Sequence, residues 1–225
     1  MLKYDLKKNI LSYKFMLYVL SILMLVFIIA FISDGSPDID SFSMYIELQW
    51  KSILLYMFPI LSALYVSDTI HNEFESGQTK YTLLHIHSKK KWFFYKLFMT
   101  ITVSVVMLVV VIISSLATFI LWHSRMIRFI DLLDAIIFIM NILLYLIPIE
   151  LVFTYIANRG VNVVPVMLTV YLVFMVIDTL FTQMFFTPTS LLSKNYSYKP
   201  FVFIVYVLVG LYANIKHILR KDYDL

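Results

Sequence analysis

The stretch LFMTITVSVVMLVVVIISSLATFIL, from Leu97 to Leu121, contains no charged residue. A helix over these residues would be about 38 Å long, which is enough to cross the hydrocarbon core of a bilayer, about 30 Å thick. The whole chain of 225 residues has a similar character, with 61% hydrophobic and only 14% charged residues. Because only helices satisfy their own backbone hydrogen bonds in lipid without closing into a barrel, the sequence predicts an all-α integral membrane protein.

Further apolar runs lie on both sides of this stretch. At roughly 20 residues per span, the second run is short and needs to extend into its polar flanks. The last reaches full length only if Lys216 and His217 extend toward the interface. The sequence therefore predicts one transmembrane domain over residues 1–225 with six helices, which are expected at 13–32, 52–66, 97–121, 135–157, 161–181 and 201–219.

The distribution of lysine and arginine predicts the orientation of these spans. With the N-terminus in the cytoplasm, 13 of the 18 lysines and arginines fall in cytoplasmic segments and five in outer ones. An excess of basic residues marks the cytoplasmic side, so both termini are expected there. Residues 1–12 fit either an amphipathic helix lying in the inner interface or a simple basic flank of the first span. Residues 182–200 are aromatic and apolar, and we expect them to dip partly into the outer leaflet.

Several classes of chemistry have no support in the sequence. The chain has no cysteine, which excludes disulfides and thiolate sites. It has no Walker A sequence, no HExxH, no GxSxG and no glycine-rich dinucleotide fingerprint. His85 and His87 are two residues apart and would point to different sides of a helix, so with His71 they do not predict a metal site. We expect no enzyme activity, no cofactor in this chain and no nucleic acid partner.

The longest expected loop, residues 67–96, is polar and cytoplasmic. Its main part reads HNEFESGQTKYTLLHIHSKKKWFFYK from His71 to Lys96, with a flexible break at Gly77. Aromatic rings settle at head-group level and lysines reach lipid phosphates. We therefore expect the second half of the loop to anchor to membrane lipids through Lys89, Lys90, Lys91, Trp92 and Lys96. A solvated connector anchored in this way is the plain interpretation of the whole loop.

The same loop resembles the cytoplasmic loop between the second and third spans of type-2 ABC transporter permeases. The resemblance lies in acidic residues before a glycine, a threonine, a Leu-Leu pair, basic residues and a lysine that opens the next helix: Glu73, Glu75, Gly77, Thr79, Leu83, Leu84, Lys89 and Lys96. The chain departs from the family pattern at Gln78, where threonine is common, and at His87, where proline is common. The resemblance implies a short coupling helix that docks on an ATPase, with candidate coupling residues Glu73, Phe74, Glu75, Gly77, Thr79, Tyr81, Leu83 and Leu84.

The resemblance implies a function as well as a loop. It implies a bacterial cell-membrane permease of an ABC exporter, in which two permeases, identical or different, work with two separate ATPase subunits that bind ATP and magnesium. It also implies a re-entrant element in residues 182–200. The 16 tyrosines, 19 phenylalanines and 12 methionines suit an amphipathic or hydrophobic cargo such as a peptide, toxin, lipid or drug. The alternative is a polytopic immunity or binding protein without transport activity.

Ionisable and small side chains inside the expected spans are further candidates. Glu150 and Asp178 would be buried in lipid, where ionisable groups are expensive and often functional. Each is a candidate for the substrate path or gating, with a structural hydrogen bond or extension toward the interface as the alternative. The third span carries small or polar side chains at helical spacing, which predicts a helix-packing face: Thr100, Ser104, Met107, Val111, Ser114 and Thr118.

Overall fold

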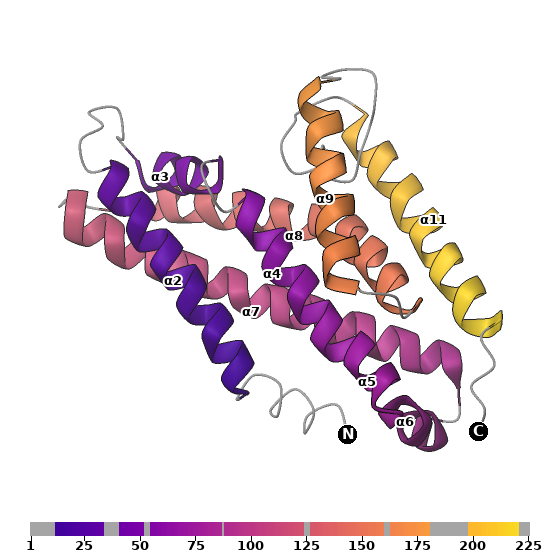
Figure 1. The fold of residues 1–225 in the computed structure, drawn as a ribbon. Coiled ribbons are helices and arrows are strands. Elements are labelled where there is room, and N and C mark those ends of the chain that lie inside the picture. Colours follow the sequence, from indigo (N-terminus) through magenta and orange to yellow (C-terminus); the bar gives the residue numbers. More distant parts are fainter. Residues whose placement is uncertain are drawn as a thin grey trace. The chain divides into compact units, whose positions relative to one another are not determined.

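The computed structural model describes residues 12–33, 41–51, 55–86, 88–123, 127–159, 163–180 and 198–220. Almost all of these residues are helical and none of them forms a strand (Figure 1). The all-α class predicted from the sequence is therefore confirmed for the described part of the chain. The expected interfacial helix over residues 1–12 and the outer loop over residues 182–200 lie almost wholly outside the described residues.

The helices follow the order of the expected spans, with additional short elements between them. Four of the helices are long and apolar enough to cross a membrane: α2, α7, α8 and α11. The bounds are α2 (Tyr13–Ser33), α3 (Phe42–Gln49), α4 (Leu55–Val66), η2 (Ser67–His71), α5 (Asn72–Glu75), α6 (Gln78–Ile86), α7 (Lys89–His123), α8 (Phe129–Ala157), α9 (Val163–Leu180) and α11 (Lys199–Arg220).

The helices that correspond to the other two expected spans are not among these four. The second corresponds to α4, which runs directly into the π-helical turn η2 and then into α5. The short apolar run therefore extends into its polar flank as helix. The fifth corresponds to α9, whose apolar part covers Val164–Ile177. By length and composition the described residues thus support four spans, and the expected total of six stays a prediction.

The chain forms two compact units, each assembled from two separate segments. The first unit contains residues 1–58 and 102–144, and the second contains residues 59–101 and 145–225. Helices α4, α7 and α8 contribute residues to both units.

In the first unit the short helix α3 packs against the later turns of α7. Ser41 caps α3, since its Oγ accepts a hydrogen bond from the backbone N–H of Met44 at 3.3 Å. The hydroxyl of Tyr45 donates to Thr118 Oγ1 at 2.9 Å, and the ring of Phe119 lies 5.4 Å from that of Tyr45. The hydrogen bond between the two buried hydroxyls and the contact between the two rings together hold α3 against α7.

The small-residue face predicted on the third span is a packing face. All six of its side chains are buried in the structure: Thr100, Ser104, Met107, Val111, Ser114 and Thr118. The hydroxyls of Ser114 and Thr118 donate to backbone carbonyls one turn earlier in α7, which satisfies them without water. The predicted packing face is thus buried within the chain, and Thr118 also accepts a hydrogen bond from Tyr45 of α3.

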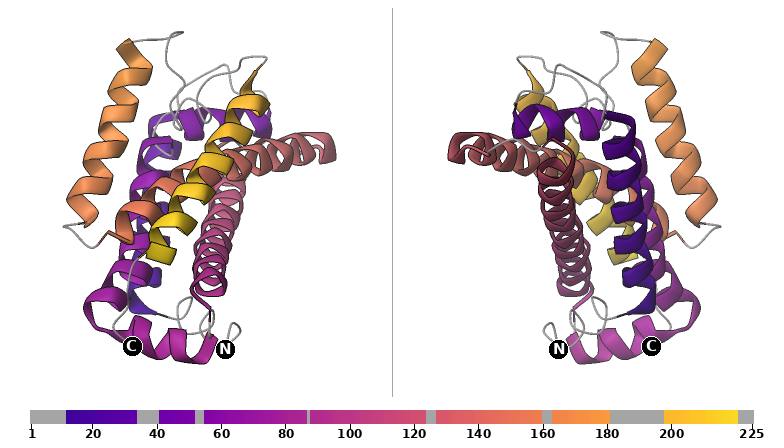
Figure 2. Two further views of the ribbon diagram at one scale, coloured as in Figure 1. Left: turned by 90° about the vertical axis from the view of Figure 1, so that its right-hand side faces the viewer. Right: turned by 90° about the vertical axis from the view of Figure 1, so that its left-hand side faces the viewer.

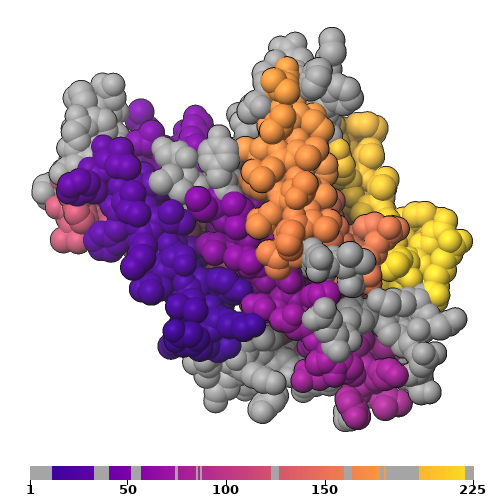
Figure 3. All heavy atoms as spheres, viewed as in Figure 1, coloured from indigo at the N-terminus to yellow at the C-terminus, as the bar shows by residue number. Residues whose placement is uncertain are grey.

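In the second unit several helix ends share one side. Figures 1 and 2 show the carboxyl ends of α8 and α11 and the amino end of α7 on the same side of this unit as α5 and α6. The space-filling view shows α9 at the surface along its length (Figure 3), and its outer side chains are apolar, including Leu172, Val173 and Val176. An apolar helix surface of this kind suits contact with lipid.

Candidate functional site

The segment between α4 and α7 contains most of the residues singled out by the sequence. After η2 the chain forms the single turn α5, turns at Gly77, continues as α6 and enters α7 after Ser88. Gly77 has a φ of +71°, in the left-handed region that favours glycine. An added Cβ there would meet nothing within 4 Å. Glycine is therefore favoured at position 77 by the backbone conformation, and not by close packing of neighbouring atoms.

An ion pair connects α5 to the first turns of α7. Lys96 Nζ donates to Glu73 Oε1, and the two residues are separated by 23 positions in the chain. The Lys96 side chain is 8% exposed and that of Glu73 is 24% exposed. Charges removed from water to this degree need their partner. The pair therefore holds the segment against α7 at the point where the membrane helix begins.

Helix α6 has an inner and an outer face. Thr79 and Leu83, four residues apart, are 2% and 6% exposed. Tyr81 and Leu84 lie on the other side and are 72% and 53% exposed. Of the expected coupling residues, Thr79 and Leu83 thus attach α6 to the protein, whereas Tyr81 and Leu84 are largely exposed. Phe74 and Glu75 belong to α5, and their side chains lie outside the described part.

The expected lipid anchor divides into exposed and buried residues. Lys90 and Lys91 are exposed at the start of α7, where Ser88 Oγ accepts a hydrogen bond from the backbone N–H of Lys91 at 3.5 Å. Trp92 is buried, and so is Lys96, which pairs with Glu73. These two residues contact protein and not the head-group region, because α7 turns that side of its first turns inward.

Glu150 of α8 lies in a buried polar contact with α4. Its side chain is buried, with 1% of the residue exposed, and Ser62 Oγ donates to its Oε1 at 3.5 Å. Tyr65, one turn further along α4, is also buried. Both helices contain a proline shortly before the polar residue, Pro59 and Pro148. Because proline removes a helix hydrogen bond, the backbone on both sides of this contact is loosened.

The carboxylate of Asp178 and the histidines contribute less to the site. Asp178 lies in α9, but its side chain is outside the described residues. His71 is buried in η2, while His87 and the side chain of His85 are also outside the described part. Within the described residues no group of three histidine, aspartate or glutamate side chains could hold a metal ion.

A pair of buried asparagines joins α8 to α11, and sequence reasoning missed it. Asn214 Nδ2 donates to the backbone carbonyl of Leu151 at 3.0 Å, and Asn158 Nδ2 donates to Asn214 Oδ1 at 3.4 Å. Next to them a Cβ on Gly210 would lie 3.1 Å from Leu151 Cβ. An asparagine in an apolar run is the signal that could have found the joint, since amides bond across helices in membranes.

The chain was compared with protein-family models, curated proteins and solved structures. No family model matches it, and neither a curated protein nor a solved structure matches it.

Proposed function

We propose that this chain is the transmembrane permease subunit of an ATP-driven ABC exporter and works with a separate ATPase. The proposal rests on helix α6, which has one buried face and one exposed face. Thr79 and Leu83 fix it to the protein, and Tyr81 and Leu84 remain exposed on its outer side. Tyrosine and leucine on a rigid support are suitable anchors for a protein partner. In the positive-inside orientation this face looks into the cytoplasm, where ATPase subunits operate.

The ion pair between Glu73 and Lys96 gives the segment a mechanical role. A partner that moves α6 also moves α5, since only Ser76 and Gly77 separate them. The ion pair then transmits the displacement to α7, because separating a buried charge from its partner costs about 3–5 kcal/mol. ATP and magnesium would be bound by two ATPase subunits, and a second permease, identical or different, would complete the transporter.

Glu150 is the candidate for gating within the membrane. The α4 helix leads directly into η2 and α5, and its Ser62 contacts Glu150. Motion of the cytoplasmic segment along α4 would therefore change the surroundings of this carboxyl group. With only 1% of the residue exposed, Glu150 fits a gate or a helix contact better than the lining of an open path. The cargo is proposed to be amphipathic or hydrophobic, such as a peptide, toxin, lipid or drug.

The first test is co-purification of the full chain with the products of neighbouring genes. A stable complex with a P-loop ATPase supports the proposal. The variant Tyr81→Ala with Leu84→Ala should lose the ATPase while the protein still inserts. The matched control is Phe129→Ala with Ile130→Ala, which removes an exposed aromatic and an exposed aliphatic side chain from another helix and should keep the ATPase.

The rival function is a polytopic immunity or binding protein without transport activity. It is favoured if no P-loop ATPase associates and if replacement of Glu73 and Gly77 leaves function intact. Charge reversal at Glu73 separates the two further: in a permease it should uncouple ATP hydrolysis from transport in a protein that still inserts. Normal coupled transport by Glu73→Lys would contradict the proposed role of the segment.

A further inference from the structure

The outer face of α11 is apolar along most of its length. Exposed apolar side chains recur every three or four positions along the helix, at Phe201, Ile204, Val205, Leu208, Val209 and Tyr212. The opposite face packs against α8, where Asn214 and Ile218 are buried. One side of α11 therefore contacts protein, and within the second unit the other side is left uncovered by the described residues.

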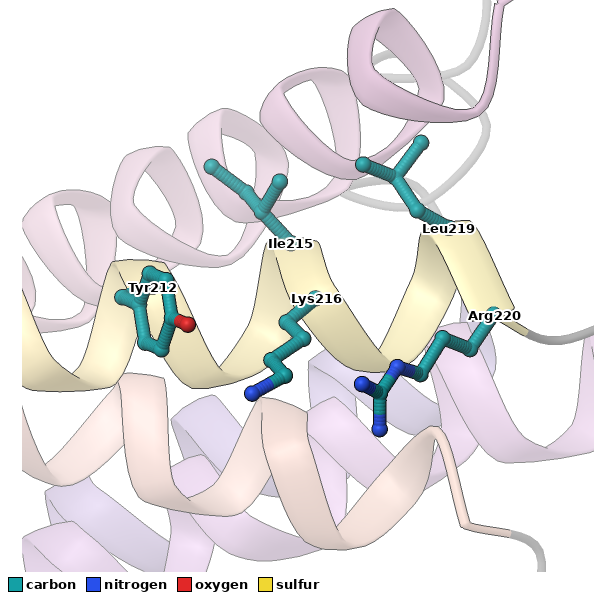
Figure 4. A pocket seen from close by; sticks show the side chains of 5 residues that line it. All are labelled: Tyr212, Ile215, Lys216, Leu219 and Arg220. Carbon is teal, nitrogen blue, oxygen red and sulfur yellow. The ribbon is translucent and has the colours of Figure 1, made fainter.

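This face ends in a pocket at the carboxyl end of the helix. The pocket has a volume of about 400 Å³ and is lined by Tyr212, Ile215, Lys216, Leu219 and Arg220 (Figure 4). Figure 4 shows the side chains of Tyr212, Lys216 and Arg220 on one side of the helix and those of Ile215 and Leu219 on the other. Lys216 Nζ lies 5.3 Å from the centre of the Tyr212 ring. The pocket thus combines apolar walls with two cations.

The two cations favour an anionic ligand. Lys216 and Arg220 are four residues apart, which places their Cβ atoms about 5–6 Å from each other on the helix surface. Like charges at this spacing repel, and α11 contains no aspartate or glutamate. Neither cation forms an ion pair with any carboxylate in the described part of the chain. A phosphate between the two side chains would relieve the repulsion and accept hydrogen bonds from both.

The length of the helix places the cations at head-group depth. Its 22 residues extend over about 33 Å, against about 30 Å for the hydrocarbon core of a bilayer. The last turns therefore reach the interface while Leu208 and Val209 lie beside acyl chains. A small soluble anion would match only the charged end of this surface. A phospholipid matches both parts, because its phosphate and its acyl chain are covalently joined.

We propose that this pocket binds one anionic phospholipid. Its phosphate lies between Lys216 and Arg220, and an acyl chain follows Tyr212 and the apolar stripe toward Leu208. By the positive-inside rule the carboxyl end of α11 is cytoplasmic, where basic pockets meet anionic lipid heads. The proposal requires only that α11 crosses the membrane, so it stands independently of the permease function.

The test uses the purified full-length protein in detergent with added dioleoyl phosphatidylglycerol, and phosphatidylcholine as the neutral lipid. Native mass spectrometry should show one phosphatidylglycerol retained per chain and no retained phosphatidylcholine. Lys216→Gln with Arg220→Gln should weaken this binding roughly thirtyfold, as expected from the loss of two cations near head groups. The matched control is Lys14→Gln with Lys80→Gln, which removes two other exposed cations and should leave binding unchanged.

Two further measurements distinguish the lipid from other outcomes. Tyr212→Ala should weaken phosphatidylglycerol severalfold, and free glycerol phosphate should not displace the lipid, since it lacks the acyl chain. The proposal is overturned if Lys216→Gln with Arg220→Gln retains the lipid like the native protein. It is also overturned if the control variant loses the lipid to the same extent, because the lipid would then be held by the overall positive charge and not by this pocket. The same holds if one equivalent of glycerol phosphate displaces the lipid. Unchanged elution and helix content of each variant exclude misfolding as the cause of a loss.

Discussion

Removal of either partner of the ion pair between Glu73 and Lys96 should destabilise the protein, but by different amounts. The Lys96 side chain is 8% exposed, whereas that of Glu73 is 24% exposed. Glu73→Gln leaves a nearly buried ammonium without its carboxylate. Lys96→Met leaves a glutamate whose side chain is one quarter exposed, although its Oε2 atom is buried, and replaces the lysine stem with an apolar chain of similar length. We therefore expect Glu73→Gln to be the more damaging change.

The magnitude follows from the burial of the charge that is left behind. Breaking a buried ion pair by removing one partner costs about 3–5 kcal/mol. This range applies to Glu73→Gln, for which about 4 kcal/mol is expected. For Lys96→Met the greater exposure of the Glu73 side chain reduces the cost to about 2 kcal/mol. At about 2–4 °C per kcal/mol for a chain of this size, the midpoints of thermal unfolding should fall by about 8–16 °C and about 4–8 °C.

The double variant Glu73→Gln with Lys96→Met makes the prediction specific to the pair. It contains neither charge, so its midpoint should be no lower than that of Lys96→Met alone. A double-mutant cycle then gives a coupling energy of roughly 4 kcal/mol. Lys91→Met is the control, because Lys91 is exposed in the same turns of α7 and should shift stability by less than about 0.5 kcal/mol.

The assay is thermal unfolding of each variant in one detergent, followed by tryptophan fluorescence, with inserted protein measured separately. If Lys96→Met lowers the midpoint of thermal unfolding as much as Glu73→Gln does, the difference in burial of the two charges has no effect on stability. If the double variant loses the sum of the two single losses, the two charges act independently.

Three other changes test packing and backbone conformation in the second unit by the same unfolding assay. Asn214→Ala should lower stability by about 1–2 kcal/mol, because it removes the amide that bonds α8 to α11, and the exposed Asn141→Ala should have almost no effect. Gly210→Ala should cost about 1–3 kcal/mol by overpacking against Leu151, and Leu151→Ala should partly rescue it. Gly77→Ala should cost about 1 kcal/mol through its positive φ, with Gly77→Asn milder.

Each of these has a result that would contradict it. Equal losses in Asn214→Ala and Asn141→Ala would show that the buried amide bonds add nothing. If the double variant of Gly210→Ala with Leu151→Ala loses as much stability as the two single losses summed, a clash with the Leu151 side chain beyond its Cβ is not the cause. Gly77→Ala at native stability would mean that the left-handed conformation is not required.

The fold class and the packing face of α7 were readable from local sequence. The run from Leu97 to Leu121 has no charge, so lipid or protein must surround it, and a helix is the structure that satisfies its backbone there. The stripe from Thr100 to Thr118 follows from helical spacing alone, and it is buried as expected. Both properties depend on neighbours within a few turns of the same helix.

The roles of the individual residues in the candidate site could not be predicted from local sequence. From the sequence, Thr79, Tyr81, Leu83 and Leu84 were equivalent members of one coupling motif. In the structure Thr79 and Leu83 face the protein and Tyr81 and Leu84 face outward. Lys96 was expected to reach lipid, yet it pairs with Glu73. The direction in which α6 and α7 turn decides these roles, and that direction depends on the packing of whole helices.

The helical fold class, the positions of the apolar helices and the small-residue face of α7 could all be predicted from the sequence, because each follows from residues close together in the chain. Helix packing, in contrast, brings Glu73 to Lys96 over 23 positions and Asn158 to Asn214 over 56. It also brings Ser62 of α4 to Glu150 of α8. The reason is physical: helix formation in lipid is satisfied residue by residue within each segment, whereas a polar pair forms only after distant segments have packed.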